Sequence, residues 1–206
     1  MYQKVVNAKT KRVLEALARI KKLPDFYLAG GTALALQLGH RRSIDLDWFS
    51  QKSFSPIQLK RDLSSLGMLK IESEDKKTLD CFLNKVKLSF FVYPYKLLFP
   101  LVDFDSFKLA DERDIACMKI DAISSRGSKK DFIDLYFLLQ KYHLKELLDL
   151  FDKKYTSIQY NRFHILKSLV YFAEAEVEPM PEMLKEISWL KVKNTLKKEV
   201  KNMVKI

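Results

Sequence analysis

The chain has 206 residues, 48% of them hydrophobic, which is enough for one large domain or for one domain with a helical appendage. Its 37 Lys and Arg residues outnumber its 26 Asp and Glu residues by 11, and this excess favours a polyanionic partner such as a nucleic acid or a nucleotide. Two cysteines exclude a disulfide framework, and no apolar run approaches the length of a transmembrane helix, so we expect a cytoplasmic protein that does not span a membrane.

The N-terminal part begins with a predicted amphipathic helix over residues 3–22, which Leu23-Pro24 ends. A short apolar strand over residues 26–29 comes next, and Gly30-Gly31 follows at once, where a tight turn is needed. The Ala and Leu residues of 32–38 then predict a helix. Because the free N–H groups at a helix N-terminus favour anions, this turn is a candidate phosphate site.

A second strand is predicted from Ile44, and it carries two carboxylates. Asp45 and Asp47 are two residues apart, so alternation along a strand directs both side chains to one face. The intervening residues Ile44, Leu46 and Trp48 are predicted to face a core. Two carboxylates on one rigid face suit Mg²⁺, which prefers oxygen ligands and shares its coordination shell with substrate phosphates. Together with the glycine turn, they indicate a site that moves a phosphoryl-type group.

The middle of the chain alternates between a helix and strands. Ser55 and Pro56 predict the N-cap and first residue of a helix that runs to about Ser65. Strands are predicted over residues 69–73, 78–83 and 86–93, with a two-residue hairpin turn at Asn84-Lys85. The apolar context of the two cysteines, Cys81 and Cys117, predicts buried thiols in a reducing compartment.

Two helices are predicted within residues 109–142, with Asp111 as N-cap of the first and Asp114 as its capping-box partner. Asp134 lies in an apolar segment of the second helix, so it needs a cationic partner, which Lys119, Arg126 or Lys130 could supply. The rest of the chain is predicted to be helical and basic. Further helices are expected after His143, over 162–175 and from Glu182 to the end. Six lysines follow Trp189, and they form either an RNA-contacting surface or a solvated helix face.

Two sets of motifs carry a resemblance to a known family. The first is Gly30-Gly31-Thr32 followed by Arg42-Ser43-Ile44-Asp45-Leu46-Asp47. It resembles the first motif of nucleotidyltransferases of the DNA polymerase β superfamily and, more narrowly, of the AbiEii/AbiGii toxin family. The later motifs of that family are similar to the stretches Asp114–Lys119, Ala122-Ile123, Arg126-Gly127 and Lys129–Leu135.

The resemblance implies an α/β (α+β) fold with a short mixed sheet flanked by helices. It places a nucleotidyltransferase core in residues 1–108 and a helical region in residues 109–206. It also implies catalytic roles for Asp45, Asp47, Lys119, Asp131 and Asp134, with Asp45 and Asp47 as the Mg²⁺ ligands. Nucleotide binding falls to Gly30, Gly31, Thr32, Arg42, Ser43 and Lys130. Whether Asp131 or Asp134 does the work is open.

The implied function is Mg²⁺-dependent transfer of a nucleotidyl group from an NTP to an acceptor, with tRNA or another RNA favoured. Such proteins act as toxins of toxin–antitoxin or phage-defence systems, which implies a cognate antitoxin. The alternative is a non-catalytic nucleotide- or RNA-binding protein with the same fold, because strand 86–93 has no acid and carries Ser89 where a third carboxylate is looked for. Asp80 is either that third ligand or a solvent-facing strand residue. Transfer to a cationic small molecule such as an aminoglycoside is disfavoured by the net charge of +11.

Overall fold

The computed structural model describes residues 1–20, 23–157 and 159–204. The chain folds into two compact units. The first contains Met1–Lys96 and Pro100–Asp111, and the second contains Leu97–Phe99 and Glu112–Ile206. The short segment Leu97–Phe99 thus leaves the first unit and belongs to the second.

The described strands of the first unit form one seven-stranded mixed sheet in the order β3-β4-β5-β2-β1-β7-β6. The strands are β1 (Tyr27–Ala29), β2 (Leu46–Ser50), β3 (Leu69–Glu74), β4 (Thr78–Leu83), β5 (Val86–Val92), β6 (Val102–Phe104) and β7 (Phe107–Leu109). β2 pairs with β5 and β1 pairs with β7 in parallel, and the other neighbours are antiparallel. This sheet with its flanking helices confirms the predicted α/β fold.

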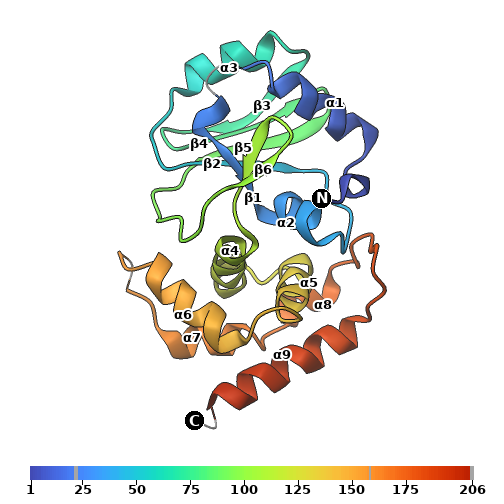
Figure 1. Ribbon diagram of the computed structural model, residues 1–206, viewed down its shortest axis with the longest axis vertical. Coiled ribbons are helices and arrows are strands. Elements are labelled where there is room, and N and C mark those ends of the chain that lie inside the picture. The colour runs from blue at the N-terminus through green and yellow to red at the C-terminus, as the bar shows by residue number, and fades with distance from the viewer. Residues whose placement is uncertain (21–22, 158, 205–206) are drawn as a thin grey trace. The chain divides into compact units, whose positions relative to one another are not determined.

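The helical segments of this unit are η1 (Gln3–Val5), α1 (Ala8–Leu17), η2 (Leu23–Asp25), α2 (Gly30–Leu38) and α3 (Pro56–Ser64). Figure 1 shows α1 and α3 on one side of the sheet. That face holds the core, in which the buried ring of Phe90 contacts Trp48 and Phe26. Where a single helix is predicted over 3–22, the structure has the short η1 and then α1, which ends at Leu17. Residues 21–22 lie outside the described part of the chain.

The predicted strand at Ile44 begins two residues later, at Leu46. Ile44 is 49% exposed, so its prediction as a core residue is wrong, whereas Leu46 and Trp48 are fully buried. The reason is that strand alternation extends only as far as the strand pairing, which starts at Leu46 opposite Leu88. β6 and β7 have no counterpart in the sequence-based prediction.

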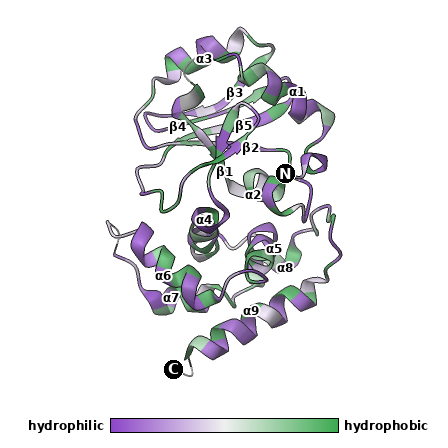
Figure 2. Cartoon of the chain, viewed as in Figure 1, coloured by the Kyte–Doolittle hydropathy of each residue, from purple (hydrophilic) through white to green (hydrophobic). Residues whose placement is uncertain are grey.

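The second unit consists of helices around α4. They are α4 (Glu112–Ser125), α5 (Lys129–Leu138), α6 (Leu144–Lys154), α7 (Arg162–Ser168), α8 (Ala173–Val177) and α9 (Trp189–Val204). α4 packs against α5, α6 and α7, and α9 packs against α5 and α6. The single helix predicted over 162–175 is two helices, α7 and α8. Val192, Leu196 and Val200 form the buried stripe of α9, and its lysines give the hydrophilic bands of Figure 2.

Both cysteines are buried free thiols, as predicted. Burial raises the pKa of the Cys81 thiol to about 12 and has the same effect on the pKa of Cys117, so neither is a reactive thiolate at neutral pH. Among the described helices, none has the length and apolar character needed to cross a bilayer.

Asp114 holds the segment Leu97–Phe99 within the second unit. Its carboxylate accepts hydrogen bonds from the backbone N–H groups of Leu98 and Phe99, at 3.1 and 3.0 Å, and from the Lys154 ammonium at 2.7 Å. The side chains of Asp114 and Lys154 are both fully buried. Asp114 is therefore not the capping-box residue that the sequence predicts, because its oxygens face a neighbouring segment and α6.

We expect Asp114→Ala to lower the free energy of unfolding by about 3–5 kcal/mol, because the substitution leaves the buried Lys154 ammonium without that carboxylate. Urea denaturation followed by circular dichroism measures the change. Lys145→Ala is the control, since it breaks the exposed Lys145–Asp149 pair of α6 and should cost less than about 0.5 kcal/mol. Equal losses in the two variants would contradict the anchoring role of Asp114.

Candidate active site

The junction of β1 and α2 brings a backbone turn against a carboxylate. Ala29, the last residue of β1, pairs with Asp47 of β2, and Gly30 follows with a φ of +67°. A Cβ atom added to Gly30 would lie 2.6 Å from Oδ2 of Asp47, which is closer than a real Cβ can approach. Only glycine combines this left-handed backbone with so close a contact. The Asp47 carboxylate thus lies directly beside the first residue of α2.

The next residue, Gly31, lies against a guanidinium group. A Cβ at Gly31 would be 2.4 Å from Nη2 of Arg41 and 3.5 Å from Oγ of Ser43. Arg41 is 3% exposed, whereas Arg42, predicted as the nucleotide-binding residue, is exposed. The N-terminal N–H groups of α2 and the Arg41 guanidinium together make this turn attractive to an anion.

Arg41 is not among the nucleotide-binding residues predicted from the sequence. Nothing in the sequence distinguishes two adjacent arginines, because which one turns inward depends on how the loop after α2 packs.

Thr32 fastens the loop that carries Asp45. Its hydroxyl donates to the backbone carbonyl of Asp45, and its Oγ1 lies 2.8 Å from Oγ of Ser43. Because the threonine hydroxyl has one proton, the Ser43 hydroxyl is the donor in the second contact. Asp45 is half-buried and immediately precedes β2. Thr32 and Ser43 therefore hold in place the loop that leads through Asp45 into β2.

Across the sheet, Asp47 is part of a row of paired residues. Ser89 of β5 pairs with Asp47 on one side and with Asp80 of β4 on the other. Paired residues point to the same face, so Asp80 shares the face of Asp47 but stands two strands away, about 10 Å. Asp80 accepts a hydrogen bond from the Ser73 hydroxyl at 2.8 Å. The position next to Asp47 is thus a serine, and Asp80 is too far to share one ion directly with Asp47.

These residues fit a cation that brings part of its own coordination shell. Nowhere in the described residues do three or more His, Cys, Asp or Glu side chains converge as a metal site. Mg²⁺ is commonly bound by one or two carboxylates together with water and substrate phosphates. Asp47 matches that mode, because the neighbouring turn at Gly30 and Gly31 offers a place for the phosphates. Asp45 precedes β2, so the strand alternation that predicts a shared face with Asp47 does not extend to it.

In the second unit, Lys119 of α4 meets both candidate acids of α5. Its ammonium nitrogen lies 2.7 Å from Oδ1 of Asp131 and 2.7 Å from Oδ2 of Asp134. Both carboxylates are fully buried, and Lys119 is 6% exposed. Of the three cations considered for Asp134 from the sequence, the structure gives Lys119. The two carboxylates share one lysine, so the cluster needs a further cation for neutrality.

Part of that compensation comes from the turn between α4 and α5. Oδ2 of Asp131 accepts a hydrogen bond from the Ser128 hydroxyl at 2.7 Å and lies 3.5 Å from Nε of Arg126. Burial by itself would raise the pKa of Asp131, but the Lys119 ammonium and the hydrogen bonds from Lys119 and Ser128 outweigh burial and hold that pKa below its ordinary value. Asp131 is therefore ionised in the folded chain at neutral pH.

The two lysines that precede Asp131 differ in environment. Lys130, predicted to bind nucleotide, is exposed at the start of α5. Lys129 is buried, and its backbone N–H donates to a carboxylate oxygen of Glu178 at 2.7 Å while its ammonium lies 5.2 Å from the centre of the Trp189 ring. Lys129 thus ties α5 to the segment after α8, which leaves Lys130 as the lysine available to solvent.

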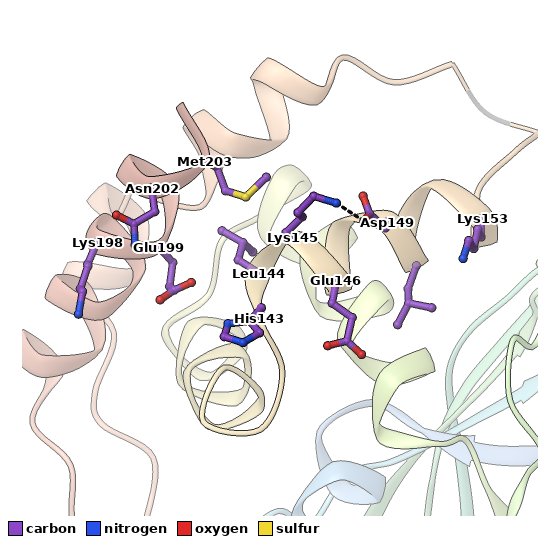
Figure 3. A pocket seen from close by; sticks show the side chains of 11 residues that line it. His143, Leu144, Lys145, Glu146, Asp149, Lys153, Lys198, Glu199, Asn202 and Met203 are labelled. Atoms are coloured by element: carbon purple, nitrogen blue, oxygen red, sulfur yellow. Dashed lines mark hydrogen bonds and ion pairs between the residues drawn. The ribbon is translucent and has the colours of Figure 1, made fainter. Parts of the chain in front are cut away.

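A cleft of about 790 Å³ lies between α6 and α9 (Figure 3). Its lining mixes both signs of charge, and Figure 3 shows the ion pair between Lys145 and Asp149 on its α6 side. Because the charges offset one another and no predicted site residue lines the cleft, we assign it no part in the chemistry.

Comparisons with known proteins identify a family and a fold. A family model described as "Nucleotidyl transferase AbiEii toxin, Type IV TA system" matches residues 12–201. An uncharacterized protein of Aquifex aeolicus (strain VF5), aq_aa25, is 42% identical over 200 residues, which cover 93% of this chain and 95% of that protein.

Two solved structures share the fold. The nucleotidyltransferase toxin MenT4 of Mycobacterium tuberculosis H37Rv is similar with a TM-score of 0.60 at 12% identity, over 97% of this chain and 86% of that one. A protein of H. pylori assigned as a nucleotidyltransferase has a TM-score of 0.55 at 17% identity, over 99% and 93% of the two chains. At these identities the structures support the fold alone.

The two glycines of the turn should respond differently to substitution. Gly30→Ala should cost about 1–3 kcal/mol of unfolding free energy, because it strains a left-handed backbone and displaces Asp47. In Gly31→Ala the new methyl group meets the end of the flexible Arg41 side chain, so folding should be affected less. Thermal and urea unfolding of both variants measure the difference. A larger loss in Gly31→Ala would show that the turn does not have this geometry.

Lys119→Ala should destabilise the second unit by about 3–5 kcal/mol at pH 7, because two buried carboxylates lose their shared cation. The pKa of Asp131 is lowered on folding, so its contribution to stability is present above the unfolded pKa, near 4, and is lost as the pH falls through the folded pKa. The difference in unfolding free energy between the native chain and Lys119→Ala should therefore become smaller below about pH 4, where protonation neutralises the acids.

Urea titrations of the native chain and of Lys119→Ala across this pH range test the expectation. Lys130→Ala is the control, since this neighbouring lysine is exposed and its loss should change the unfolding free energy by less than about 0.5 kcal/mol. If Lys119→Ala lost the same unfolding free energy at pH 3.5 as at pH 7, charge pairing would be ruled out as the cause of the loss.

Proposed function

Because the chain belongs to the AbiEii nucleotidyltransferase toxin family of type IV toxin–antitoxin systems, we propose that it transfers a nucleotidyl group from an NTP to an RNA acceptor, with tRNA favoured, and requires Mg²⁺. The contact of Gly30 with Asp47 carries this proposal. It puts an anion-binding helix N-terminus beside a carboxylate that can hold a cation, which is the pairing that a metal–nucleotide complex needs.

In the proposed reaction, the hydroxyl oxygen of the acceptor attacks the α-phosphorus of the NTP. A new phosphorus–oxygen bond forms, the bond to the bridging oxygen breaks, and pyrophosphate leaves. The backbone N–H groups at Gly30 and Gly31 would bind phosphate oxygens, and Arg41 would add positive charge beside Gly31. Asp45 and Asp47 would hold Mg²⁺, which supplies charge neutralisation to the phosphates and lowers the pKa of a bound hydroxyl.

Lys119, Asp131 and Asp134 are retained in the proposal as catalytic residues on the resemblance of their motif. Lys119 is assigned to phosphate binding, and one of the two acids to the metal site or to removal of the acceptor proton. The short ion pairs of Lys119 with both acids mean that any phosphate contact has to compete with two carboxylates. Arg42, Ser43 and Lys130 would contribute to nucleotide binding from the exposed or half-buried positions they occupy.

RNA is the favoured acceptor because of charge. The chain carries a net charge of +11, and the exposed side of α9 presents lysines at 191, 197, 198 and 201. Such a surface attracts a polyanion and disfavours a cationic small molecule. The family also suggests a cognate antitoxin as a partner, and we place the reaction in the cytoplasm, where NTPs and tRNA occur together.

A chain that binds a nucleotide without transferring it is the second candidate. Ser89 favours this reading, because it occupies the sheet position next to Asp47 where a third carboxylate would complete a two-metal site. In that case NTP would bind without dependence on Mg²⁺, and neither the native chain nor an Asp47 variant would form a product.

Incubation with each α-labelled NTP, Mg²⁺ and total tRNA should label RNA with the native chain. Asp47→Asn should lower the rate by about a hundredfold or more, because a metal ligand at the reacting phosphate is lost. Asp103→Asn is the control, an exposed acid of β6 in the same unit, and it should retain full activity. Asp80→Asn should also retain most activity, since Asp80 stands two strands from Asp47.

Three other results have clear meanings. A loss in Asp80→Asn as large as that in Asp47→Asn would identify Asp80 as a ligand. Absence of labelled RNA from a native chain that binds NTP would favour another acceptor or the non-catalytic candidate. Labelled RNA of equal amount from native chain and Asp47→Asn would exclude Asp47 from the reaction.

A further inference from the structure

One face of the sheet carries a row of aromatic rings that the proposed reaction does not use. The rings of Tyr27 on β1, Phe49 on β2 and Phe91 on β5 lie side by side, with centroid separations of 6.1 and 5.1 Å and interplanar angles of 25° and 29°. Tyr93 contacts Phe49 edge-on at 5.3 Å. We name these four residues the aromatic ladder.

The aromatic ladder stands on the same face as the Asp47 carboxylate. Phe49 follows Asp47 by two residues on β2, so the two side chains point the same way about 7 Å apart. Phe91 follows Ser89 in the same manner on β5. The ladder is therefore the row directly beside the one that contains Asp47, Ser89 and Asp80.

Tyr27, at 4% exposed, belongs to the buried core, but core packing does not account for Phe49 and Phe91. The core rings Trp48 and Phe90 lie on the opposite face and are fully buried. Phe49 and Phe91 alternate with them along β2 and β5 and stay half-buried, next to half-buried Asp47. Large rings kept partly exposed beside carboxylates are a feature of surfaces that receive an aromatic ligand.

The parallel part of the ladder ends at Phe91. Its partner across the strand on β4 is Thr78, a short side chain, and in the described part of the chain the only ring that contacts Phe91 is Phe49. The side of the Phe91 ring that faces β4 thus adjoins a small residue. A planar ring placed over Thr78 would extend the row in the same offset-stacked manner.

We propose that the base of the substrate NTP stacks on this side of Phe91, over Thr78, while its phosphates occupy the turn at Gly30 and Gly31. This inference rests on the proposed function, because the nucleotide is the ligand of both. Thr78 stands one row along the strands and two strands across from Asp47, roughly 12 Å away. A sugar together with one phosphate and a cation held by Asp47 covers about that span, whereas a sugar alone does not. Every nucleobase has a π-face, so the ladder would add affinity for any of the four NTPs.

The test compares a nucleotide with a probe that has no base. ATP and inorganic tripolyphosphate are titrated into the full-length chain in the presence of Mg²⁺, and the Kd is measured by calorimetry. Phe91→Ala should weaken ATP binding about tenfold or more, as expected for the loss of one stacked base, and leave tripolyphosphate binding unchanged. Phe91→Tyr, which keeps an aromatic face, should bind ATP like the native chain.

Phe82→Ala is the matched control. Phe82 lies on the same face and is also half-buried, but it pairs with Lys87 on the other side of the Asp80–Ser89 row, outside the ladder. Its substitution should leave ATP binding unchanged. Phe91→Leu keeps most of the apolar volume but has no aromatic face, so it should also weaken ATP binding. It replaces Phe91→Ala in the test if that variant does not fold. Urea denaturation of each variant reports its folding.

The outcomes separate this inference from the proposed function. Transfer of label by the native chain, together with equal ATP affinity in Phe91→Leu and the native chain, would overturn the stacking role and leave the reaction standing. Weaker binding of a single-stranded RNA with unchanged ATP binding would also overturn it, because the ladder would then receive the acceptor. A native chain that binds tripolyphosphate and ATP equally well would show that the base makes no contact, and one that binds neither would overturn both proposals.

Discussion

The close approach of the Gly30 backbone to the Asp47 carboxylate is the constraint on which the site depends. β1 ends at Ala29, opposite Asp47, and the chain can enter α2 there because Gly30 adopts a left-handed conformation without a Cβ. The result sets the positive end of a helix dipole beside an anionic side chain. In the proposed reaction, a cation would bridge this carboxylate to a phosphate at the turn.

Buried charges organise the second unit in a comparable way. α4 carries Asp114 and Lys119, and each meets an opposite charge on a different neighbour, namely Lys154 on α6 and the two acids of α5. An apolar interface alone would tolerate several registers between helices, whereas a buried ion pair is stable only when its partners meet. The helices around α4 are thereby fixed at particular positions. The same requirement explains why the Leu97–Phe99 segment, whose N–H groups face Asp114, belongs to this unit.

The sequence revealed the fold class, the glycine turn and the positions of most helices and strands, because these follow from local patterns. The Asn84-Lys85 turn is an example, since both residues adopt the positive φ that a two-residue hairpin requires. Features that depend on distant partners were missed or misread. The capping role predicted for Asp114 ignored Lys154, and the core position predicted for Ile44 assumed a pairing that starts at Leu46. β6 and β7 are each too short to show alternation.

The alternation of side chains along strands links the proposed metal site to the proposed binding site of the base. Because successive residues of a strand point to opposite faces, the face that carries Asp47 must also carry Phe49, and the face with Ser89 must carry Phe91. The spacing between a carboxylate row and an aromatic row is therefore a property of the β-strand and does not need a dedicated loop. In the proposed complex the phosphates lie at the turn beside Asp47 and the base lies beside Phe91, so one sheet face supplies both the carboxylate and the aromatic ring with residues that also complete the sheet.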